Sequence, residues 1–215
     1  LDWGSRTFIM GIINITPDSF SGDGVMADRD MVSASLRLAE DFIRDGADII
    51  DLGAESSRPG AQPVTHDEEL QRLLPVLQAI RNAFPQTLVS VDTFKAQTAE
   101  ACLKNGADWI NDIFGLKSDL QMAQIVANHQ AGIIIMHNRS QAGAVSDHAQ
   151  LGRSYKAADY EDIIRDVKED LAVSLRMAQE AGINKDAIIL DPGLGFGKSV
   201  THNLEILNRL DELRE

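Results

Sequence analysis

Short apolar runs alternate along the chain with longer segments in which apolar residues recur every three or four positions. In one such segment Leu36, Ala39 and Ile43 fall on a single helical face, which is typical of a helix packed on a sheet. The pattern predicts strands at 8–13, 48–52, 87–92, 109–113, 132–136 and 187–191. It predicts helices at 30–45, 67–83, 96–105, 119–129, 160–181 and 201–213. Strands separated by helices are expected to pair in parallel, which indicates an α/β protein with six βα units.

A short internal repeat supports these boundaries. Residues 46–51 read Gly-Ala-Asp-Ile-Ile-Asp, and residues 106–111 read Gly-Ala-Asp-Trp-Ile-Asn. In both copies a glycine stands between a helix and a strand, and glycine readily adopts the left-handed conformation that closes a helix. The repeat aligns Asp51 with Asn111.

Polar side chains stand at the carboxyl ends of nearly all the expected strands. They are Asn14, Asp51, Asp92, Asn111 with Asp112, His137, and Asp191. All carboxyl ends in a (β/α) barrel open onto one face, so these side chains are predicted to meet in one pocket. One aspartate alone would most simply cap the next turn. Three strands end in buried carboxylates that need partners, those of Asp51, Asp92 and Asp191, and this repetition favours a shared polar ligand. Strand alternation turns only one of Asn111 and Asp112 inward, and the repeat favours Asn111.

Three long connections follow strands, at 14–29, 53–66 and 137–159. Active-site loops of a (β/α) barrel lie in such positions, and long loops in compact domains are usually functional or disordered. The third connection is rich in serine and glycine and is expected to be an irregular, mobile loop.

The first two of these connections contain candidate anion sites. The segment from Asn14 to Ser21 is either a simple proline-containing turn or a polar site for a metal and phosphate oxygens. In the second connection Arg58 lies between serines and a Pro-Gly pair. Its guanidinium fork is suited to binding an anion, and the alternative is a surface arginine in a turn.

The stretch from Asp191 to Ser199 reads Asp-Pro-Gly-Leu-Gly-Phe-Gly-Lys-Ser. It is not a Walker A loop, because Pro192 replaces the first glycine, and it is not a GxGxxG fingerprint. A tight strand-to-helix turn would explain the glycines, whereas Phe196 and Lys198 favour contact with a flat ligand. Met136, at the end of another strand, would either flank such a ring or belong to the core.

Composition narrows the class of partner. The 215 residues are expected to form one domain, 1–215. A formal net charge of -13 disfavours nucleic acid and anionic membrane surfaces as partners. The single cysteine, Cys102, excludes an intrachain disulfide and suits a reducing compartment. Without a basic leader or a long apolar run, the protein is expected to be cytoplasmic.

Five of these motifs, in order and spacing, resemble the dihydropteroate synthase family of pterin-binding (β/α)8 TIM barrels. They are Asn14-Ile-Thr-Pro-Asp-Ser-Phe20, Asp51-Leu-Gly-Ala-Glu-Ser-Ser-Arg-Pro-Gly60, Val91-Asp-Thr93, Ile110-Asn-Asp112 and Asp191-Pro-Gly-Leu-Gly-Phe-Gly-Lys198. The resemblance spans the chain. It implies a transferase of folate biosynthesis that condenses 6-hydroxymethyl-7,8-dihydropterin pyrophosphate with 4-aminobenzoate, giving 7,8-dihydropteroate and pyrophosphate.

The resemblance also implies a role for each candidate residue. The pterin would be bound by Asp92, Asn111, Met136 and Asp191. The pyrophosphate would be bound by Asn14, Ser57 and Arg58, and its Mg2+ cofactor by Asn14. The 4-aminobenzoate site, for which sulfonamides would compete, would be formed by Phe20, Pro59 and Phe196. The catalytic residues would be Arg58, Asp92 and Asp191. Barrels of this kind commonly form homodimers through helices of the last two βα units, so the oligomeric state stays open.

The sequence departs from the family pattern at Ala54, Ser57 and Asn138, where glycine, threonine and methionine are usual. It also ends at Glu215, before the last two βα units, in which the family keeps a Ser-Arg-Lys and an Arg-x-His segment. The sequence as given is therefore expected to bind weakly and turn over poorly. Two alternatives are a pterin-binding methyltransferase domain using methyltetrahydrofolate, against which the pyrophosphate-type loops argue, and a catalytically silent pterin-binding relative.

Overall fold

The computed structural model describes residues 2–16, 28–56, 61–140, 145–148 and 152–214. Its contacts divide the chain into two compact units, residues 1–56 with 63–111, and residues 57–62 with 112–215. Each unit contains parallel strands and α-helices, so the predicted α/β class is confirmed. The single domain over 1–215 stays a prediction.

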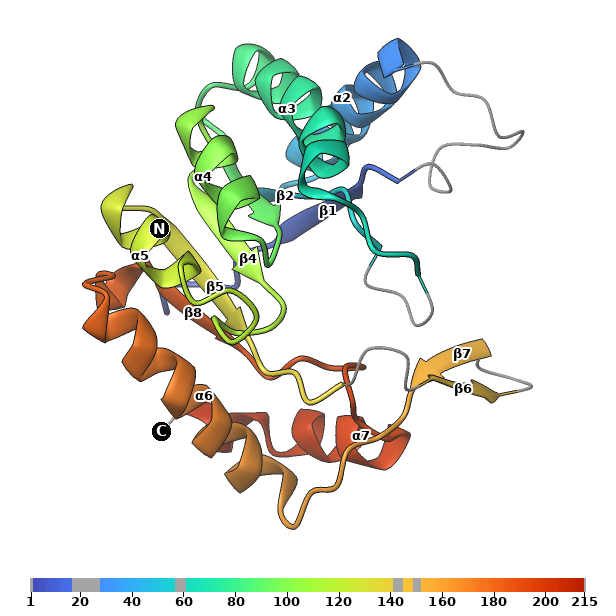
Figure 1. Ribbon diagram of the computed structural model, residues 1–215, viewed down its shortest axis with the longest axis vertical. Helices are drawn as coiled ribbons and strands as arrows, with labels where there is room; N and C mark the ends of the chain where they lie inside the picture. The colour runs from blue at the N-terminus through green and yellow to red at the C-terminus, as the bar shows by residue number, and fades with distance from the viewer. Residues whose placement is uncertain (1, 17–27, 57–60, 141–144, 149–151, 215) are drawn as a thin grey trace. The chain divides into compact units, whose positions relative to one another are not determined.

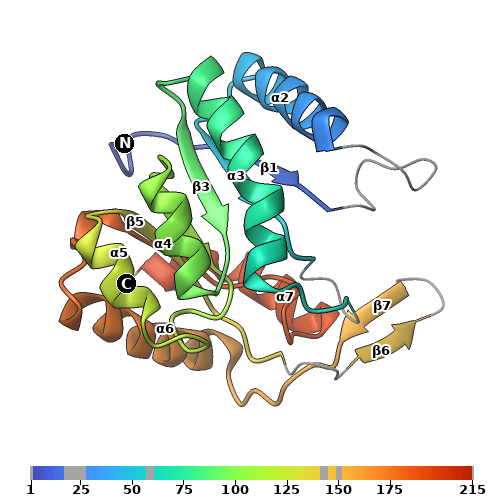
Figure 2. The same cartoon turned by 45° about the horizontal axis from the view of Figure 1, so that its top comes forward.

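The first unit alternates strands with helices. Its elements are β1 (Met10–Asn14), α2 (Asp28–Arg44), β2 (Ile49–Gly53), α3 (His66–Ala83), β3 (Leu88–Asp92), α4 (Ala96–Lys104) and β4 (Trp109–Asp112). The strands pair in parallel in the order β1-β2-β3-β4. Helices α2, α3 and α4 lie along one side of these strands (Figures 1 and 2).

The sheet of the first unit has one thoroughly apolar face. One residue from each strand lies in the same register row of this face, and all four are fully buried: Ile13, Leu52, Val91 and Ile110. On the same face of β1, a Cβ at Gly11 would lie 2.5 Å from Cδ2 of Phe42 in α2. Because side chains alternate along a strand, the residues next to this row point to the opposite face.

Helix α3 begins where its sequence signals a start. The side chain of Thr65 accepts a hydrogen bond from Glu68 N at 3.3 Å, and Glu68 Oε2 accepts one from Thr65 N at 3.1 Å. This capping box satisfies two backbone donors that would otherwise lack partners. It fixes the point at which the long connection after β2 becomes helical.

The second unit adds two further parallel strands and a hairpin. Its elements are α5 (Met122–Asn128), β5 (Gly132–Met136), β6 (Val145–His148), β7 (Gly152–Tyr155), α6 (Ile163–Glu180), the 3-10 helix η1 (Lys185–Ala187), β8 (Ile188–Asp191), α7 (Val200–Asn208) and the 3-10 helix η2 (Leu210–Arg214). Strand β5 pairs in parallel with β8, from Ile133 with Ile188 to Met136 with Asp191.

The prediction of an irregular loop over 137–159 is wrong. Strands β6 and β7 form an antiparallel hairpin there, in which Val145 pairs with Tyr155 and His148 with Gly152. Strand prediction depended on apolar runs, and these two strands are made mostly of polar residues and glycine. The helix expected at 201–213 is also divided, since α7 ends at Asn208 and η2 follows.

Candidate active site

The carboxyl ends of four strands in the first unit align in one row. The register pairs Asn14 with Gly53, Gly53 with Asp92, and Asp92 with Asn111. Residues in one register row of a parallel sheet point to the same face. Three candidate side chains, from Asn14, Asp92 and Asn111, therefore share the face opposite the helices. We call Asn14, Gly53, Asp92 and Asn111 the strand-end row.

Glycine at position 53 leaves a space in the strand-end row. A Cβ at Gly53 would lie 3.5 Å from Asp92 Oδ2 and 3.7 Å from Asn14 Oδ1. An amide oxygen and a carboxylate oxygen beside this space are suited to a hard cation such as Mg2+. No group of three or more His, Cys, Asp or Glu in the described part of the chain is placed to hold a metal. A cation at Asn14 would therefore need most of its ligands from a bound anion or water.

Asp51 lies one register row deeper on the same face and is 1% exposed. Asn111 donates from Nδ2 to Asp51 Oδ2 at 3.3 Å. Within the described residues, three buried atoms here have no hydrogen-bond partner: Asp51 Oδ1, Ser90 Oγ and Asn111 Oδ1. Burial raises the pKa of Asp51, and the polar side chains of Ser90 and Asn111 offset this only in part. Buried polar atoms left without partners cost folding free energy and commonly mark functional positions.

Asp112 has a different role from its neighbour Asn111. Its carboxylate accepts hydrogen bonds from Phe114 N at 2.9 Å and Leu116 N at 2.8 Å, and its side chain is fully buried. Burial raises the pKa of Asp112, and these backbone hydrogen bonds oppose the shift. Asp112 therefore caps the turn that follows β4, whereas Asn111 lies in the strand-end row.

A buried ionic network that the sequence did not predict supports the connection after β2. Lys95, the N-cap residue of α4, forms ion pairs with Glu55 and, at 3.0 Å, with Glu69 of α3. Glu55 also accepts a hydrogen bond from Val64 N at 3.2 Å, which joins the two ends of the connection. Burial alone would lower the pKa of Lys95, but its hydrogen bonds with Glu55 and Glu69 outweigh burial and raise it. The only local feature of the sequence that could have indicated this network is the position of Lys95, three residues after Asp92.

The second unit carries Met136 and Asp191 as paired residues at the ends of β5 and β8. Met136 is 5% exposed. Asp191 accepts a hydrogen bond from Gly193 N through Oδ1 at 2.7 Å. One carboxylate oxygen of Asp191 thus caps the turn that follows the strand, as the simpler alternative predicted. This fixes the orientation of the carboxylate.

The glycine loop, residues 192–197, approaches other backbone so closely at Gly193 and Gly197 that glycine is required at both positions. Gly193 has φ +66°, and a Cβ there would lie 2.0 Å from the carbonyl oxygen of His137. Gly197 has φ +62°, and a Cβ there would lie 2.7 Å from Ser140 N. Positive φ and this lack of space both exclude larger side chains. The loop is therefore built against the chain that leaves β5.

Lys198 is buried at the end of the glycine loop, 5% exposed. Its ammonium donates to the carbonyl oxygens of Gly193 at 2.8 Å, Phe196 at 3.1 Å and His137 at 3.4 Å. Burial lowers the pKa of Lys198 to about 8. The direct ligand contact suggested by the sequence does not describe this lysine, because its ammonium is engaged with backbone oxygens.

His137 is likewise engaged inside the second unit. Its Nε2 lies 3.0 Å from Asp170 Oδ2 of α6, and Arg139 Nε donates to the same oxygen at 2.6 Å. Burial lowers the pKa of His137 to about 4, with a further contribution from the charge of Lys198. The imidazole is therefore neutral at pH 7 and serves the packing of β5 on α6.

Four residues that the resemblance assigned to the site lie outside the described residues: Phe20, Ser57, Arg58 and Pro59. Their roles stay predictions. Asn14, Asp92, Asn111, Met136, Asp191 and Phe196 are described, each within its own unit.

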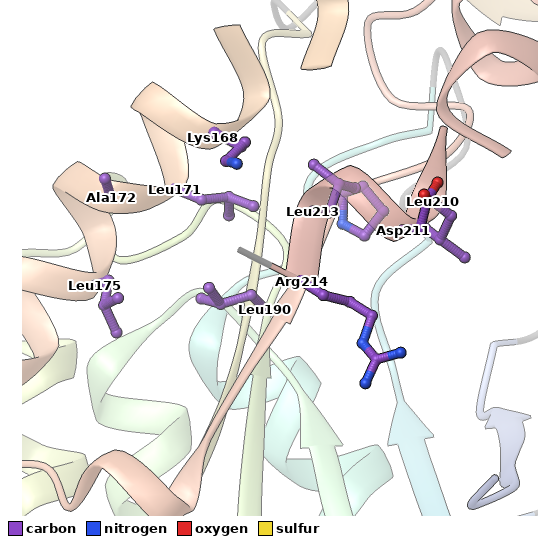
Figure 3. Close-up of a pocket in the computed structure, with 10 residues that line it drawn as sticks. Lys168, Leu171, Ala172, Leu175, Leu190, Leu210, Asp211, Leu213 and Arg214 are labelled. Atoms are coloured by element: carbon purple, nitrogen blue, oxygen red, sulfur yellow. The ribbon is translucent and has the colours of Figure 1, made fainter. Parts of the chain in front are cut away.

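An apolar cavity of about 640 Å³ lies elsewhere in the second unit. Figure 3 shows its lining by Leu171 and Leu175 of α6, Leu190 of β8, and Leu210 and Leu213 of η2. Leu190 and Asp191 are successive residues of one strand, so their side chains point to opposite faces. The cavity therefore does not belong to the face that carries Asp191.

None of the helices in the described part of the chain combines the length and apolarity required to span a bilayer.

Comparison with known proteins gives a consistent result. The family model described as "Pterin binding enzyme" matches residues 10–215. A dihydropteroate synthase of Clostridium beijerinckii is 40% identical over 212 residues, which cover 99% of this chain and 71% of that protein. A crystal structure of dihydropteroate synthase from Clostridium difficile in the presence of pteroic acid has a TM-score of 0.87 and 40% identity, covering 100% of this chain and 74% of that one. The dihydropteroate synthase of Burkholderia cenocepacia, complexed with 7,8-dihydropteroate, has a TM-score of 0.80 and 35% identity. The match covers 98% of this chain and 67% of that one.

Proposed function

This chain belongs to the pterin-binding enzyme family and, within it, to the dihydropteroate synthases, so we propose that its strand ends bind a pterin pyrophosphate and 4-aminobenzoate for condensation. The chain is accordingly a transferase of folate biosynthesis with the TIM-barrel fold class of its relatives. The observation that carries the residue-level proposal is the strand-end row. It presents an amide oxygen, a carboxylate and a second amide on one face of the sheet.

We assign the pterin ring to Asp92 and Asn111 of the first unit and to Met136 and Asp191 of the second. A pterin carries several N–H donors and ring acceptors in one plane. Carboxylates accept from such donors in charge-assisted hydrogen bonds, which contribute on the order of 1.5–3 kcal/mol each. Asp191 has one oxygen fixed by Gly193 N, so its carboxylate is held in place before the ligand arrives. Met136 offers a polarizable side chain to the ring face.

We assign the pyrophosphate to Asn14, Ser57 and Arg58. The guanidinium of Arg58 would pair with phosphate oxygens in two parallel hydrogen bonds. The space beside Gly53 and the amide oxygen of Asn14 fit a Mg2+ that arrives with the pyrophosphate. When bound, this ion would neutralise charge on the departing pyrophosphate.

We assign the 4-aminobenzoate site to Phe20, Pro59 and Phe196, where sulfonamides would compete. Phe196 is placed by the glycine loop, and its backbone N donates to Gly193 O at 3.2 Å. Aromatic and proline side chains give a flat ligand apolar contact on both sides.

The residues suggest a substitution at the pterin methylene. The bond from the methylene carbon to the pyrophosphate oxygen breaks, its electron pair leaves with pyrophosphate, and the amine nitrogen of 4-aminobenzoate forms the new bond and then loses a proton. Positive charge that develops on the pterin as the bond breaks would be favoured by the carboxylates of Asp92 and Asp191. Arg58 would stabilise the leaving group. An aromatic amine is neutral at pH 7, so no strong base is required for attack.

The proposal is tested by incubating the full polypeptide with both substrates and Mg2+ and measuring dihydropteroate and pyrophosphate release. We expect Asp92→Asn to reduce kcat/KM at least 100-fold, because it removes a charge at the pterin. The matched control is Asp67→Asn, which makes the same chemical change at an exposed position of α3. Equal activity of Asp92→Asn and the control would remove the assigned role of Asp92, and absence of product from the unsubstituted protein would overturn the proposed activity.

A further inference from the structure

The ammonium of Lys198 has no donor left for a ligand. A lysine ammonium has three N–H donors, and Lys198 directs hydrogen bonds to three backbone oxygens, those of Gly193, Phe196 and His137. Its side chain is also buried. Any effect of this lysine on substrate binding must therefore pass through the backbone it holds.

That backbone carries two of the proposed substrate contacts. Gly193, whose carbonyl accepts from Lys198, donates its N–H to Asp191 Oδ1 at 2.7 Å. Phe196, whose carbonyl also accepts from Lys198, donates its own N–H to Gly193 O at 3.2 Å. The third acceptor, His137 O, belongs to the chain leaving β5. One ammonium thus connects the end of β5 with both ends of the turn that orients Asp191 and Phe196.

We propose that Lys198 is a positioning residue that pins the glycine loop to the end of β5, and thereby sets both the Asp191 carboxylate and the Phe196 side chain for substrate. This inference rests on the proposed function, in which Asp191 contacts pterin and Phe196 contacts 4-aminobenzoate.

The helix that follows does not need this lysine. Ser199 caps α7 by accepting a hydrogen bond from His202 N at 3.1 Å, and the reciprocal hydrogen bond of a capping box is also present. Burying an ammonium is costly even when it is hydrogen-bonded. An apolar side chain of similar length would avoid this cost but would not hold the carbonyl groups of Gly193, Phe196 and His137 together. A lysine at this position is therefore better explained by the geometry that it imposes than by stability.

The test replaces Lys198 with methionine, which keeps the length of the side chain and removes its donors. Lys185→Met is the matched control, because Lys185 is an exposed lysine of the same unit. Dissociation constants for pteroic acid and KM values for both substrates are measured on the full polypeptide, well below the melting temperature of each variant. We expect Lys198→Met to raise the dissociation constant at least 10-fold and to raise KM for 4-aminobenzoate, and we expect the control to match the unsubstituted protein.

A double-mutant cycle with Phe196→Ala separates positioning from general damage. If Lys198 acts through Phe196, the two substitutions together raise KM for 4-aminobenzoate by clearly less than the product of their separate effects. Multiplicative effects, or unchanged affinity for pteroic acid in Lys198→Met, would overturn the inference. If the unsubstituted protein binds no pteroic acid, the proposed function fails first, and with it the basis for this role.

Discussion

Asn111 Nδ2 donates to Asp51 Oδ2 at 3.3 Å, across 60 residues of sequence, and so joins the strand-end row to the buried layer beneath it. Asp51 is 1% exposed, and its second oxygen has no hydrogen-bond partner among the described residues. The direction of this hydrogen bond is fixed, because an ionised carboxylate can only accept a hydrogen bond. It therefore orients the amide of Asn111, leaving its second N–H as a donor.

Replacing Asp51 with asparagine is expected to stabilise the protein while weakening pterin binding. Burial raises the pKa of Asp51, so above the ordinary pKa of a carboxyl group the ionised form costs stability, and a neutral isostere removes that cost. We expect the free energy of unfolding in urea to rise at pH 7. Pteroic acid should bind at least 5-fold more weakly, because an asparagine can also donate and no longer fixes the Asn111 amide. Reduced stability would instead mean that the carboxylate makes a net favourable set of hydrogen bonds.

Acidification is expected to destabilise the protein through His137. Burial lowers the pKa of this imidazole to about 4, so between pH 6.5 and 4 the unfolded chain binds a proton that the folded protein does not. Stability should be fully present above pH 6.5 and fall as the pH drops, by about 2 kcal/mol at pH 5 from this group. Urea unfolding at pH 7 and pH 5 measures the difference. His137→Gln should remove that part of the pH dependence, and an unchanged dependence in the variant would refute the assignment.

Removing Lys95 alone is expected to destabilise the protein more than removing the charges of Lys95 and Glu69 together. Lys95→Met leaves Glu69, whose side chain is 1% exposed, without its cation, and we expect a loss of about 2 kcal/mol or more in the free energy of unfolding. The double variant Lys95→Met with Glu69→Gln should recover part of that loss, because the charge at the fully buried Glu69 is removed and only Glu55 is left without its cation. Thermal and urea unfolding provide the comparison. Additive losses in the double variant would show that the buried charge is not the cause.

Two glycines of one loop should respond very differently to alanine. Gly193 and Gly195 both have positive φ, at +66° and +85°, but only at Gly193 is there a clash, with a Cβ 2.0 Å from His137 O. At Gly195 nothing lies within 4 Å of the added atom. Gly195→Ala should cost about 1 kcal/mol of backbone strain, whereas Gly193→Ala should cost several times more and abolish pteroic acid binding. Similar effects on binding would contradict the close approach of the glycine loop to the chain after β5.

Six of the described strands were predictable from the sequence because each is a short apolar run with a polar residue at or near its carboxyl end. The observed ends differ from the prediction by at most two residues, as at β1, which begins at Met10 rather than at residue 8. The choice of Asn111 rather than Asp112 as the inward-facing residue followed from a visible repeat, which aligns Asn111 with Asp51. Local patterns were sufficient for these features because periodicity and glycine stops are encoded within a few residues.

Long-range polar pairing was not predictable. Glu55 and Lys95 are 40 residues apart, and His137 and Asp170 are 33 apart, so neither pair leaves a local pattern. The same applies to Lys198, whose three acceptors are backbone carbonyls that any sequence would supply. The β6–β7 hairpin was missed for a different reason, since its pairing depends on backbone hydrogen bonds rather than on an apolar face.

The close approach of Phe42 to Gly11 limits which substitutions β1 can tolerate beneath α2. The absence of a side chain at Gly11 allows the ring of Phe42 to lie directly over β1. Its Cδ2, Cγ and Cβ atoms would all lie within 3.1 Å of a methyl group at Gly11. Even alanine at this position would force Phe42 to move, because Cγ, the ring carbon attached to its Cβ, is among the atoms in the way. A single added methyl group at Gly11, three residues before β1 ends at Asn14, would therefore disturb the packing of α2 on the sheet.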